Sequence, residues 1–229
     1  MSPESKPKIV AMIVGSAIIM QQIDSTVITT ALPQMAISLH TDPLRLSVAV
    51  TAYLLSLAVF VPVSGWAADR FGGRTVFRAA IALFTLGSIL CGLCGNVVEL
   101  TAARVLQGLG GAMMVPVGRL VLFRSVEKAA LIATMAYLQV PAQLGPVLGP
   151  PIGGFITTYF SWRWIFLVNV PLGILGIVLV TVFFDNPKED TARPFDYLGF
   201  LLTGGALCSL MYSIEAAGRG RGDLRAVGV

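Results

Sequence analysis

Long apolar runs separated by short polar stretches make up most of the chain. A helix that spans a bilayer needs about 20 consecutive, predominantly apolar residues. Seven runs approach or exceed that length, at residues 9–38, 46–68, 76–95, 99–122, 130–157, 163–184 and 196–216. The pattern therefore predicts an all-α integral membrane protein with seven spanning helices.

The same pattern divides the chain into five parts. A short amino terminus (1–8) precedes a bundle of six spanning helices (9–184), which is followed by a linker (185–195), the seventh helix (196–216) and a tail (217–229). We expect the amino terminus and the linker to lie on the same side of the membrane.

Composition supports a membrane protein and argues against a soluble one. Of the 229 residues, 55% are hydrophobic and only 12% are charged, whereas about a quarter of the residues in an ordinary soluble domain are charged. The formal net charge is +4, but the basic residues are scattered between apolar runs and form no patch. The charge therefore predicts no nucleic-acid partner, and the expected partner of most of the surface is the lipid bilayer.

The basic residues are divided unevenly between the two sides of the predicted membrane. Before the tail, the side that holds the amino terminus has ten, whereas the other side has two, Arg45 and Arg163. The tail breaks this pattern, because after seven spans it should lie on the second side but carries Arg219, Arg221 and Arg225, and its side stays open. Lys and Arg are enriched in cytoplasmic loops, so the pattern predicts a multi-pass protein of the plasma (inner) membrane with a cytoplasmic amino terminus. The ten basic residues are Lys6, Lys8, Arg70, Arg74, Arg78, Arg119, Arg124, Lys128, Lys188 and Arg193.

Asp24 lies inside the first apolar run, where a carboxylate costs about 2.5–3.5 kcal/mol on insertion scales. Its neighbours Gln21, Ser25 and Thr29 have the spacing of one helical face, which we expect to line the bundle interior or a water-filled path. Two interpretations remain open. Asp24 either bonds to a neighbouring helix in a purely structural role, or exchanges protons or meets a cationic ligand.

Arg104 is the second ionisable residue within a predicted span, with Gln107 less than one helical turn further on. A guanidinium is effectively always protonated, so Arg104 does not carry a proton itself, but it can hold a carboxylate, backbone carbonyls or an anion. Near the end of its run, Arg104 can instead extend to the lipid headgroups. The glycines beside it favour an inward-facing side chain.

The stretch LGPVLGPPIGGF (144–155) combines two features in the fifth run. Gly145, Gly149 and Gly153 recur every four residues, which favours close approach to another helix, and the prolines between them remove backbone donors and bend a helix. Gln139 and Gln143 extend the polar character toward the start of the run. A kink with only an architectural role remains an alternative.

The sequence lacks the signatures of several other protein classes. No GxxxxGK[ST] loop is present, so nothing indicates an ATP-driven pump. His40 is the only histidine, which leaves no zinc-like cluster or catalytic triad. Cys91 and Cys94 form a CxxC within an apolar run, where packing explains them better than metal binding or redox chemistry. We expect no enzymatic activity, no metal site and no cofactor.

Five motifs follow one another along the chain. They are IDSTVITTALP (23–33), GWAADRFGGR (65–74), LTAARVLQGLGGA (100–112), LGPVLGPPIGG (144–154) and SWRWIFLVNVPLG (161–173). In this order they resemble motifs of the major facilitator superfamily, specifically its fourteen-helix drug:proton antiporters. The resemblance implies a six-helix amino-terminal half of the major facilitator fold, with 196–216 as an extra seventh transmembrane helix.

The resemblance also implies roles for particular residues. Asp24 and Arg104 match positions associated with proton coupling, with a proton gradient as the energy source. A conformational-switch loop is implied at Gly65, Asp69, Arg70, Gly72 and Arg74, in which Gly73 departs from the family because that place is often basic. The antiporter motif of helix five is implied at Gly145, Pro146, Gly149, Pro150, Gly153 and Gly154, and we expect it at a dry seam between two halves. The expected substrate path comprises Gln21, Ser25, Thr29, Gln107, Gln139 and Gln143.

The chain is short for such a transporter, which builds its path between two six-helix halves. The leading hypothesis is the amino-terminal half of a proton-driven exporter of small amphipathic or cationic compounds. It would work with a missing carboxyl-terminal half or with a second chain. The alternative is a truncated, non-transporting half-bundle that binds a partner or acts as a sensor.

Overall fold

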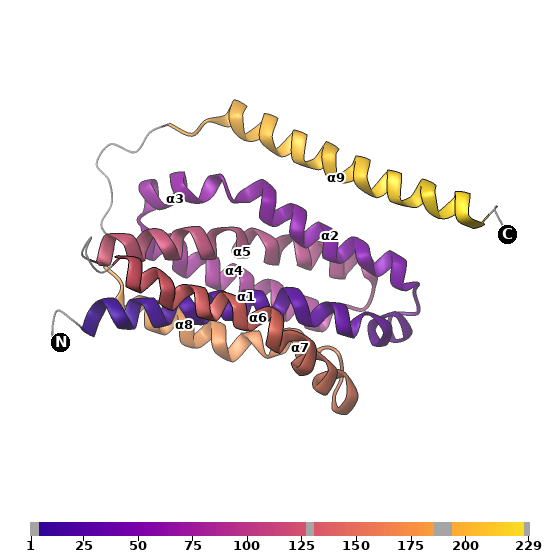
Figure 1. Ribbon diagram of the computed structural model, residues 1–229, viewed down its shortest axis with the longest axis horizontal. Coiled ribbons are helices and arrows are strands. Elements are labelled where there is room, and N and C mark those ends of the chain that lie inside the picture. The colour runs from indigo at the N-terminus through magenta and orange to yellow at the C-terminus, as the bar shows by residue number, and fades with distance from the viewer. Residues whose placement is uncertain (1–4, 127–130, 186–193, 227–229) are drawn as a thin grey trace.

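The computed structural model describes residues 5–126, 131–185 and 194–226, and every regular element within these ranges is an α-helix (Figure 1). The elements are α1 (Ser5–Ser38), α2 (Pro43–Phe60), α3 (Val63–Phe71), α4 (Gly73–Leu93), α5 (Val97–Ser125), α6 (Leu131–Tyr159), α7 (Trp164–Leu167), α8 (Asn169–Phe183) and α9 (Tyr197–Ala226). The predicted all-α fold is confirmed.

Five stretches of the described residues are long and apolar enough to cross a membrane. They are Ile9–Ser38, Pro43–Phe60, Gly73–Leu93, Val97–Ser125 and Trp164–Phe183. In α9 the apolar part is shorter and comprises Tyr197–Met211. These spans agree with a multi-pass membrane protein.

Two of the predicted single spans are broken into two helices each. The run at 46–68 divides into α2 and α3 around Val61 and Pro62, because a proline offers no N–H to the helix ladder. The run at 163–184 divides into α7 and α8 at Val168. The prediction of one continuous helix was wrong around Pro62, whereas the span predicted at 163–184 is confirmed as one apolar stretch, Trp164–Phe183, in which Val168 keeps helical backbone angles.

The ends of the chain also differ from the predicted division. Helix α9 continues to Ala226, so most of the predicted tail (217–229) is helical. Helix α1 begins at Ser5 within the predicted amino terminus. Most of the predicted linker, including Lys188 and Arg193, lies outside the described residues, as does Lys128.

Helix starts are fixed by local caps that also set the register of the polar residues. Asn96 accepts a hydrogen bond from the backbone N–H of Glu99 at 2.9 Å, and the Glu99 carboxylate accepts one from the N–H of Gly95 at 2.8 Å. This reciprocal arrangement satisfies donors that a helix start leaves free. Helix α5 starts at Val97, and Arg104 and Gln107, three residues apart, both lie on its buried face.

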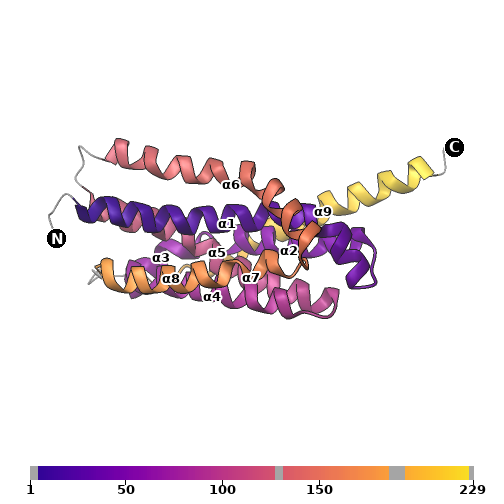
Figure 2. The same ribbon diagram turned by 90° about the horizontal axis from the view of Figure 1, so that it is seen from below.

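Helix α1 lies at the centre of the packing, in contact with α5, α6 and α8, while α5 also packs against α4 and α2. Figure 2 shows α6 beside α1 along much of its length. Helix α9 contacts α2, and aromatic pairs support this side of the molecule. Phe60 and Phe200 have ring centroids 5.9 Å apart, and the Trp66 and Phe195 rings are 4.8 Å apart.

The apolar core consists of two clusters, one toward each end of the bundle. Along α1, residues from Val10 to Met20 belong to one cluster, and residues from Val27 to Ala36 belong to the other. A layer of buried polar side chains separates them, with contributions from α1, α4, α5 and α8: Gln21, Asp24, Ser88, Arg104, Gln107 and Asn169. The fold thus places these six buried polar groups together at mid-depth.

The loops that were predicted to share one side do lie at one end of the bundle. Arg124, near the end of α5, donates to Asp69 in α3 at 3.1 Å, and Arg74 in α4 donates to the backbone carbonyl of Thr181 in α8. At the other end, Arg163 donates to the carbonyl of Cys94 at 3.2 Å. Which end faces the cytoplasm stays a prediction from the basic residues.

Candidate functional site

Asp24 and Arg104 form an ion pair in the middle of the bundle. Arg104 Nη1 lies 2.6 Å from Asp24 Oδ2, and the two side chains are 0% and 1% exposed. Arg104 therefore does not extend to the membrane surface, as one interpretation of the sequence allowed. Its charge is held inside the protein by a carboxylate from α1.

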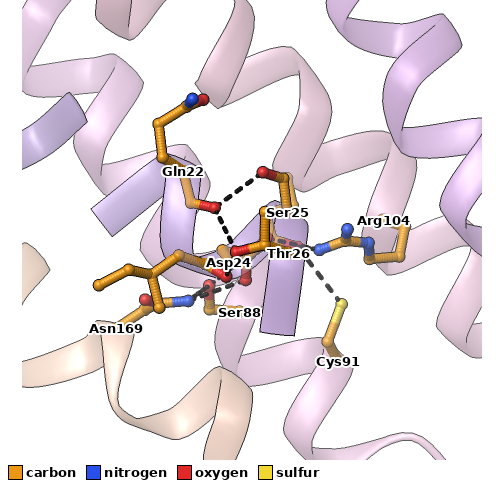
Figure 3. A network of polar contacts seen from close by, with 10 residues as sticks. Gln22, Asp24, Ser25, Thr26, Ser88, Cys91, Arg104 and Asn169 are labelled. Carbon is orange, nitrogen blue, oxygen red and sulfur yellow. Dashed lines mark hydrogen bonds and ion pairs between the residues drawn. The ribbon is translucent and has the colours of Figure 1, made fainter. Parts of the chain in front are cut away.

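Two amides complete the hydrogen bonding of the carboxylate (Figure 3). Gln107 Nε2 on α5 and Asn169 Nδ2 on α8 each donate to Asp24 Oδ1 at 2.9 Å. Both amides also donate to Ser88 Oγ on α4, at 2.7 and 3.3 Å. Figure 3 shows Asn169 and Arg104 approaching Asp24 from opposite sides. Four helices thus converge on one carboxylate.

The guanidinium of Arg104 also contacts two aromatic rings. Its Cζ lies 4.1 Å from the centroid of the Tyr53 ring on α2 and 5.7 Å from that of Phe166 on α7. Arg104 Nη1 additionally donates to Gln107 Oε1 at 2.6 Å. The cation is therefore surrounded by groups from α1, α2, α5 and α7.

The arrangement stabilises the charged pair and makes its separation costly. Asp24 accepts three hydrogen bonds, all from buried side chains. Removing one partner from a buried ion pair typically costs about 3–5 kcal/mol because an uncompensated charge remains. Any event that takes Arg104 away from Asp24 therefore has to supply another neutralising group.

The predicted polar face of the first helix is only partly buried. Gln21 and Asp24 are buried, whereas Ser25 is half-buried and Thr29 is exposed. The hydroxyls of Ser25 and Thr29 donate to backbone carbonyls of α1 itself, those of Gln22 and Thr26. The face therefore runs from the ion pair to the surface of the described bundle.

Gln139 and Gln143 lie on an exposed face of α6 and do not reach the ion pair. Together with Pro146 and Pro150, which are also exposed, they follow the spacing i, i+4, i+7 and i+11 of one helical stripe. Of the six residues predicted for the substrate path, only Gln107 bonds to Asp24.

The three glycines of α6 pack against α1. A Cβ on Gly149 would overlap the hydroxyl of Thr26, and a Cβ on Gly153 would overlap that of Thr30. Gly145 is in the same relation to the Cβ of Gln22. Since residues 22, 26 and 30 also recur every four positions, two matching stripes let the backbones of α1 and α6 approach closely.

This contact changes the interpretation of the proline-glycine stretch. We expected the stripe at a seam between two halves, but the glycines face α1 of the same bundle. Gly154 is not part of the close contact, since nothing lies within 4 Å of a Cβ placed there. Pro146, Pro150 and Pro151 are among the exposed residues of this stretch.

The loop between α3 and α4 depends on one glycine conformation. Gly72 has φ +86°, a region that favours glycine, and it ends α3 and precedes α4. Gly73 departs from the family pattern, and a Cβ there would lie 2.6 Å from Val121 Cγ2. A larger residue at this place would therefore require the Val121 side chain to move. Nothing lies within 4 Å of a Cβ on Gly65.

Several residues of the site were not predicted from the sequence, among them Asn169, Tyr53 and Ser88. Asn169 gave a signal that could have been used, because a lone amide in the apolar run WIFLVNVPLG needs a buried partner. Tyr53 and Ser88 gave none, since both residue types are common in membrane helices for other reasons. Only the fold brings them to Asp24 and Arg104.

Comparison with known families places the whole bundle in one of them. The family model described as Major Facilitator Superfamily matches residues 14–214. A protein of Serratia proteamaculans (strain 568) named "Putative multidrug resistance protein MdtD" is 46% identical over 203 residues, which are 89% of this chain and 42% of that protein. Its namesake from Salmonella paratyphi B (strain ATCC BAA-1250 / SPB7) is 46% identical over 205 residues, 90% of this chain and 43% of that protein. The chain thus spans less than half the length of these relatives.

Solved structures support the same fold. The proton:xylose symporter XylE, bound to 6-bromo-6-deoxy-D-glucose, has a TM-score of 0.73 at 16% identity, covering 100% of this chain and 57% of that chain. A bacterial homolog of the human lysosomal transporter Spinster, inward-facing and unoccupied, has a TM-score of 0.67 at 15% identity, covering 86% and 47%. At these identities the likeness shows the fold alone.

Proposed function

Because the chain belongs to the Major Facilitator Superfamily, a family of transporters and not of enzymes, we propose that it forms the amino-terminal half of a proton-coupled efflux antiporter. The proposed substrates are small amphipathic or cationic compounds. The relatives named as putative multidrug resistance proteins support this substrate class. A second half, from a continuation of this chain or from another chain, would complete the path.

The observation that carries the proposal is the buried pair of Asp24 and Arg104 at 2.6 Å. A carboxylate at this depth has to be neutralised, and three groups can do so: Arg104, a proton or a cationic substrate. A proton and a cation that compete for the same carboxylate exclude one another. This exclusion links the release of one to the binding of the other, which is the requirement for exchange.

The surroundings of the pair support a switching role over a purely structural one. Asp24 accepts hydrogen bonds from α5 and α8, two helices that also pack against α4. If a proton displaces Arg104, the bonds that join these helices through Asp24 are rearranged. Protonation can thus bias one arrangement of the helices over another, as rocking of two halves around a fixed site requires.

The route for substrate is proposed along the partly polar sides of α1 and α6. Ser25 and Thr29 extend from the ion pair toward the surface of the bundle, and Gln139 and Gln143 lie on the exposed stripe of α6. In a complete transporter these surfaces would face the second half or the cavity between the halves. Apolar neighbours of that cavity would hold the apolar parts of the substrate.

The loop at the end of α3 is proposed as the conformational switch. Asp69 there pairs with Arg124 at 3.1 Å, and both side chains are partly exposed, so the pair contributes little to stability. Such a pair can exchange partners when the second half docks or withdraws. The amino terminus and this loop are proposed to be cytoplasmic.

Proton-coupled antiport is tested in proteoliposomes that hold the complete transporter and an imposed pH gradient. Adding a permanently cationic amphipathic dye such as ethidium should drive protons across the membrane and partly dissipate the gradient. Vesicles without the protein are the control. Dye movement that leaves the gradient unchanged would contradict proton coupling, and the absence of movement for cationic and neutral amphipathic dyes would contradict the proposed substrates.

A further inference from the structure

We propose that Tyr53 is a positioning residue for Arg104. Its aromatic face holds the guanidinium in place while Asp24 is neutral, so that the ion pair re-forms when the carboxyl group loses its proton. The role in transport rests on the proposed function, whereas the position of the guanidinium can be tested without it.

Only one of the three guanidinium nitrogens of Arg104 forms hydrogen bonds with the described residues. Both of its side-chain hydrogen bonds, to Asp24 and to Gln107, come from the single nitrogen Nη1. Nε and Nη2 are buried and have no hydrogen-bond partner among the described residues. Arg104 and Asp24 therefore do not form the bidentate pair that fixes the orientation of many arginine side chains on a carboxylate.

The Tyr53 ring supplies the missing support. Its centroid lies 4.1 Å from Arg104 Cζ, well within the distance of about 6 Å at which a cation is attracted to an aromatic face. The Phe166 ring is further away, at 5.7 Å. This attraction is strongest where water is excluded, and both Tyr53 and Arg104 are fully buried.

The position of Tyr53 is fixed by close packing of α2 against α5. A Cβ on Gly108 would lie 2.8 Å from the backbone oxygen of Tyr53, so only glycine permits this approach. One turn further along α2, Ser56 donates to the carbonyl of Val105 at 2.8 Å. The backbone that carries the ring is therefore held against α5 by contacts that do not involve Asp24.

Asp24 and the Tyr53 ring therefore respond differently to protonation. Protonation of Asp24 removes the negative charge but leaves the ring and its quadrupole unchanged. The charged or titratable side chains that act on Arg104 are Asp24 on α1, Tyr53 on α2 and Cys91 on α4. The neighbours from α7 and α8, Phe166 and Asn169, carry no charge. While Asp24 is neutral, the favourable partners that remain for the cation are Gln107 Oε1, which contacts Nη1 alone, and the Tyr53 ring, which faces the guanidinium at 4.1 Å.

The position of the guanidinium can be read from the Nε–H signal of Arg104 by NMR. The full chain is labelled with ¹⁵N-arginine in a membrane mimetic, and the signal is assigned by its loss in Arg104→Lys. A proton above an aromatic face is shifted upfield by the ring current. The shift should persist in Asp24→Asn, which mimics the neutral carboxyl, and in Tyr53→Phe, but should disappear in Tyr53→Leu.

Transport measurements test the consequence with the same variants. In the complete transporter at equal protein level, Tyr53→Leu should slow pH-gradient-driven efflux at least about tenfold, as expected for loss of a desolvated cation–π contact. Tyr53→Phe, which keeps the ring, should retain most of the rate. Phe166→Leu removes the more distant ring and should have a smaller effect than Tyr53→Leu.

The inference is overturned if the Arg104 signal in Asp24→Asn loses its upfield shift, because the ring then fails to hold the guanidinium without the carboxylate. It is also overturned if Tyr53→Phe and Tyr53→Leu slow efflux equally, since the hydroxyl would then matter and not the ring. A wild-type protein that shows no proton-driven transport would contradict the proposed function, and the NMR result would still decide the position of Arg104. If Tyr53→Leu does not fold, the spectra of Asp24→Asn and Tyr53→Phe decide.

Discussion

The carboxylate of Asp24 accepts three hydrogen bonds, and the donors come from α5 and α8. A charged group in this setting has a defined geometry because each donor is itself held by a second contact. Gln107 and Asn169 share Ser88 Oγ as an acceptor, and Arg104 lies against Tyr53. The residues around Asp24 thus determine where its charge lies and what has to move when that charge is removed.

Asn169 provides a test of this arrangement at the scale of one residue. Asn169→Leu removes a hydrogen bond to a charged group, a contact worth about 1.5–3 kcal/mol. We expect pH-gradient-driven efflux to fall at least about tenfold at equal protein level, since each 1.4 kcal/mol is a factor of ten. Vesicle efflux assays measure this directly.

Ser88→Ala is the matched control for that variant. It removes the acceptor shared by the two amides but leaves both of their bonds to Asp24 in place. Its effect should be clearly smaller. Equal loss of efflux in Ser88→Ala and Asn169→Leu would show that the network as a whole matters, and not the donor to Asp24.

Some of this site can be predicted from the sequence and some cannot. Asp24 and Arg104 are conspicuous because ionisable residues are rare within apolar spans. Their partners are harder to predict, since Tyr53 and Ser88 are compatible with lipid, packing or backbone contacts. The pattern of apolar spans predicts how deep a residue lies in the membrane and which face of its helix it occupies. Which helix faces meet one another is decided by packing across the bundle.

The pairing of α1 with α6 illustrates this at the scale of elements. The glycine spacing of α6 predicted a close helix contact but not its partner, which is α1 of the same bundle and not a second half. The partner stripe on α1 consists of Gln22, Thr26 and Thr30, whose small or flexible side chains meet the glycine backbone. Breaks in helices were also missed, because proline interrupts the run around Pro62 but is tolerated throughout α6.

Gly149→Leu tests the close contact between α1 and α6. A side chain there would overlap Thr26, and overpacking of this kind typically costs about 1–3 kcal/mol. We expect a lower thermal unfolding midpoint in detergent and loss of transport by the complete protein, with less effect on membrane insertion. Gly154→Leu is the control, because a Cβ there meets nothing within 4 Å. Similar destabilisation by both substitutions would refute the proposed role of the stripe.

At the scale of the whole molecule, the described bundle combines a polar middle with two apolar ends. The loops on one end carry most of the basic residues, and those at the other end carry few. The charge distribution therefore predicts the orientation that the fold by itself leaves open. The existence of spanning helices could be predicted from hydropathy because a bilayer permits few alternatives to them.

Cysteine labelling tests that orientation. Leu44→Cys places a thiol at an exposed position in the first turn of α2, and Lys188→Cys places one after α8, both in a background without the exposed Cys208. A membrane-impermeant maleimide added to intact cells should label the first thiol and reach the second only after the membrane is opened. The reverse pattern would place the amino terminus outside.

The rate of pH-gradient-driven efflux by Asp24→Asn, in proteoliposomes that contain the complete transporter, tests most directly whether Asp24 is the coupling group. Asparagine keeps the size of the side chain and much of its hydrogen bonding but cannot exchange a proton, so efflux driven by a pH gradient should fall at least about tenfold. Exchange of a neutral substrate between the two sides without a gradient should persist, because it needs no change in protonation. Gradient-driven efflux at the wild-type rate, at equal protein level, would contradict the claim that Asp24 is the coupling group.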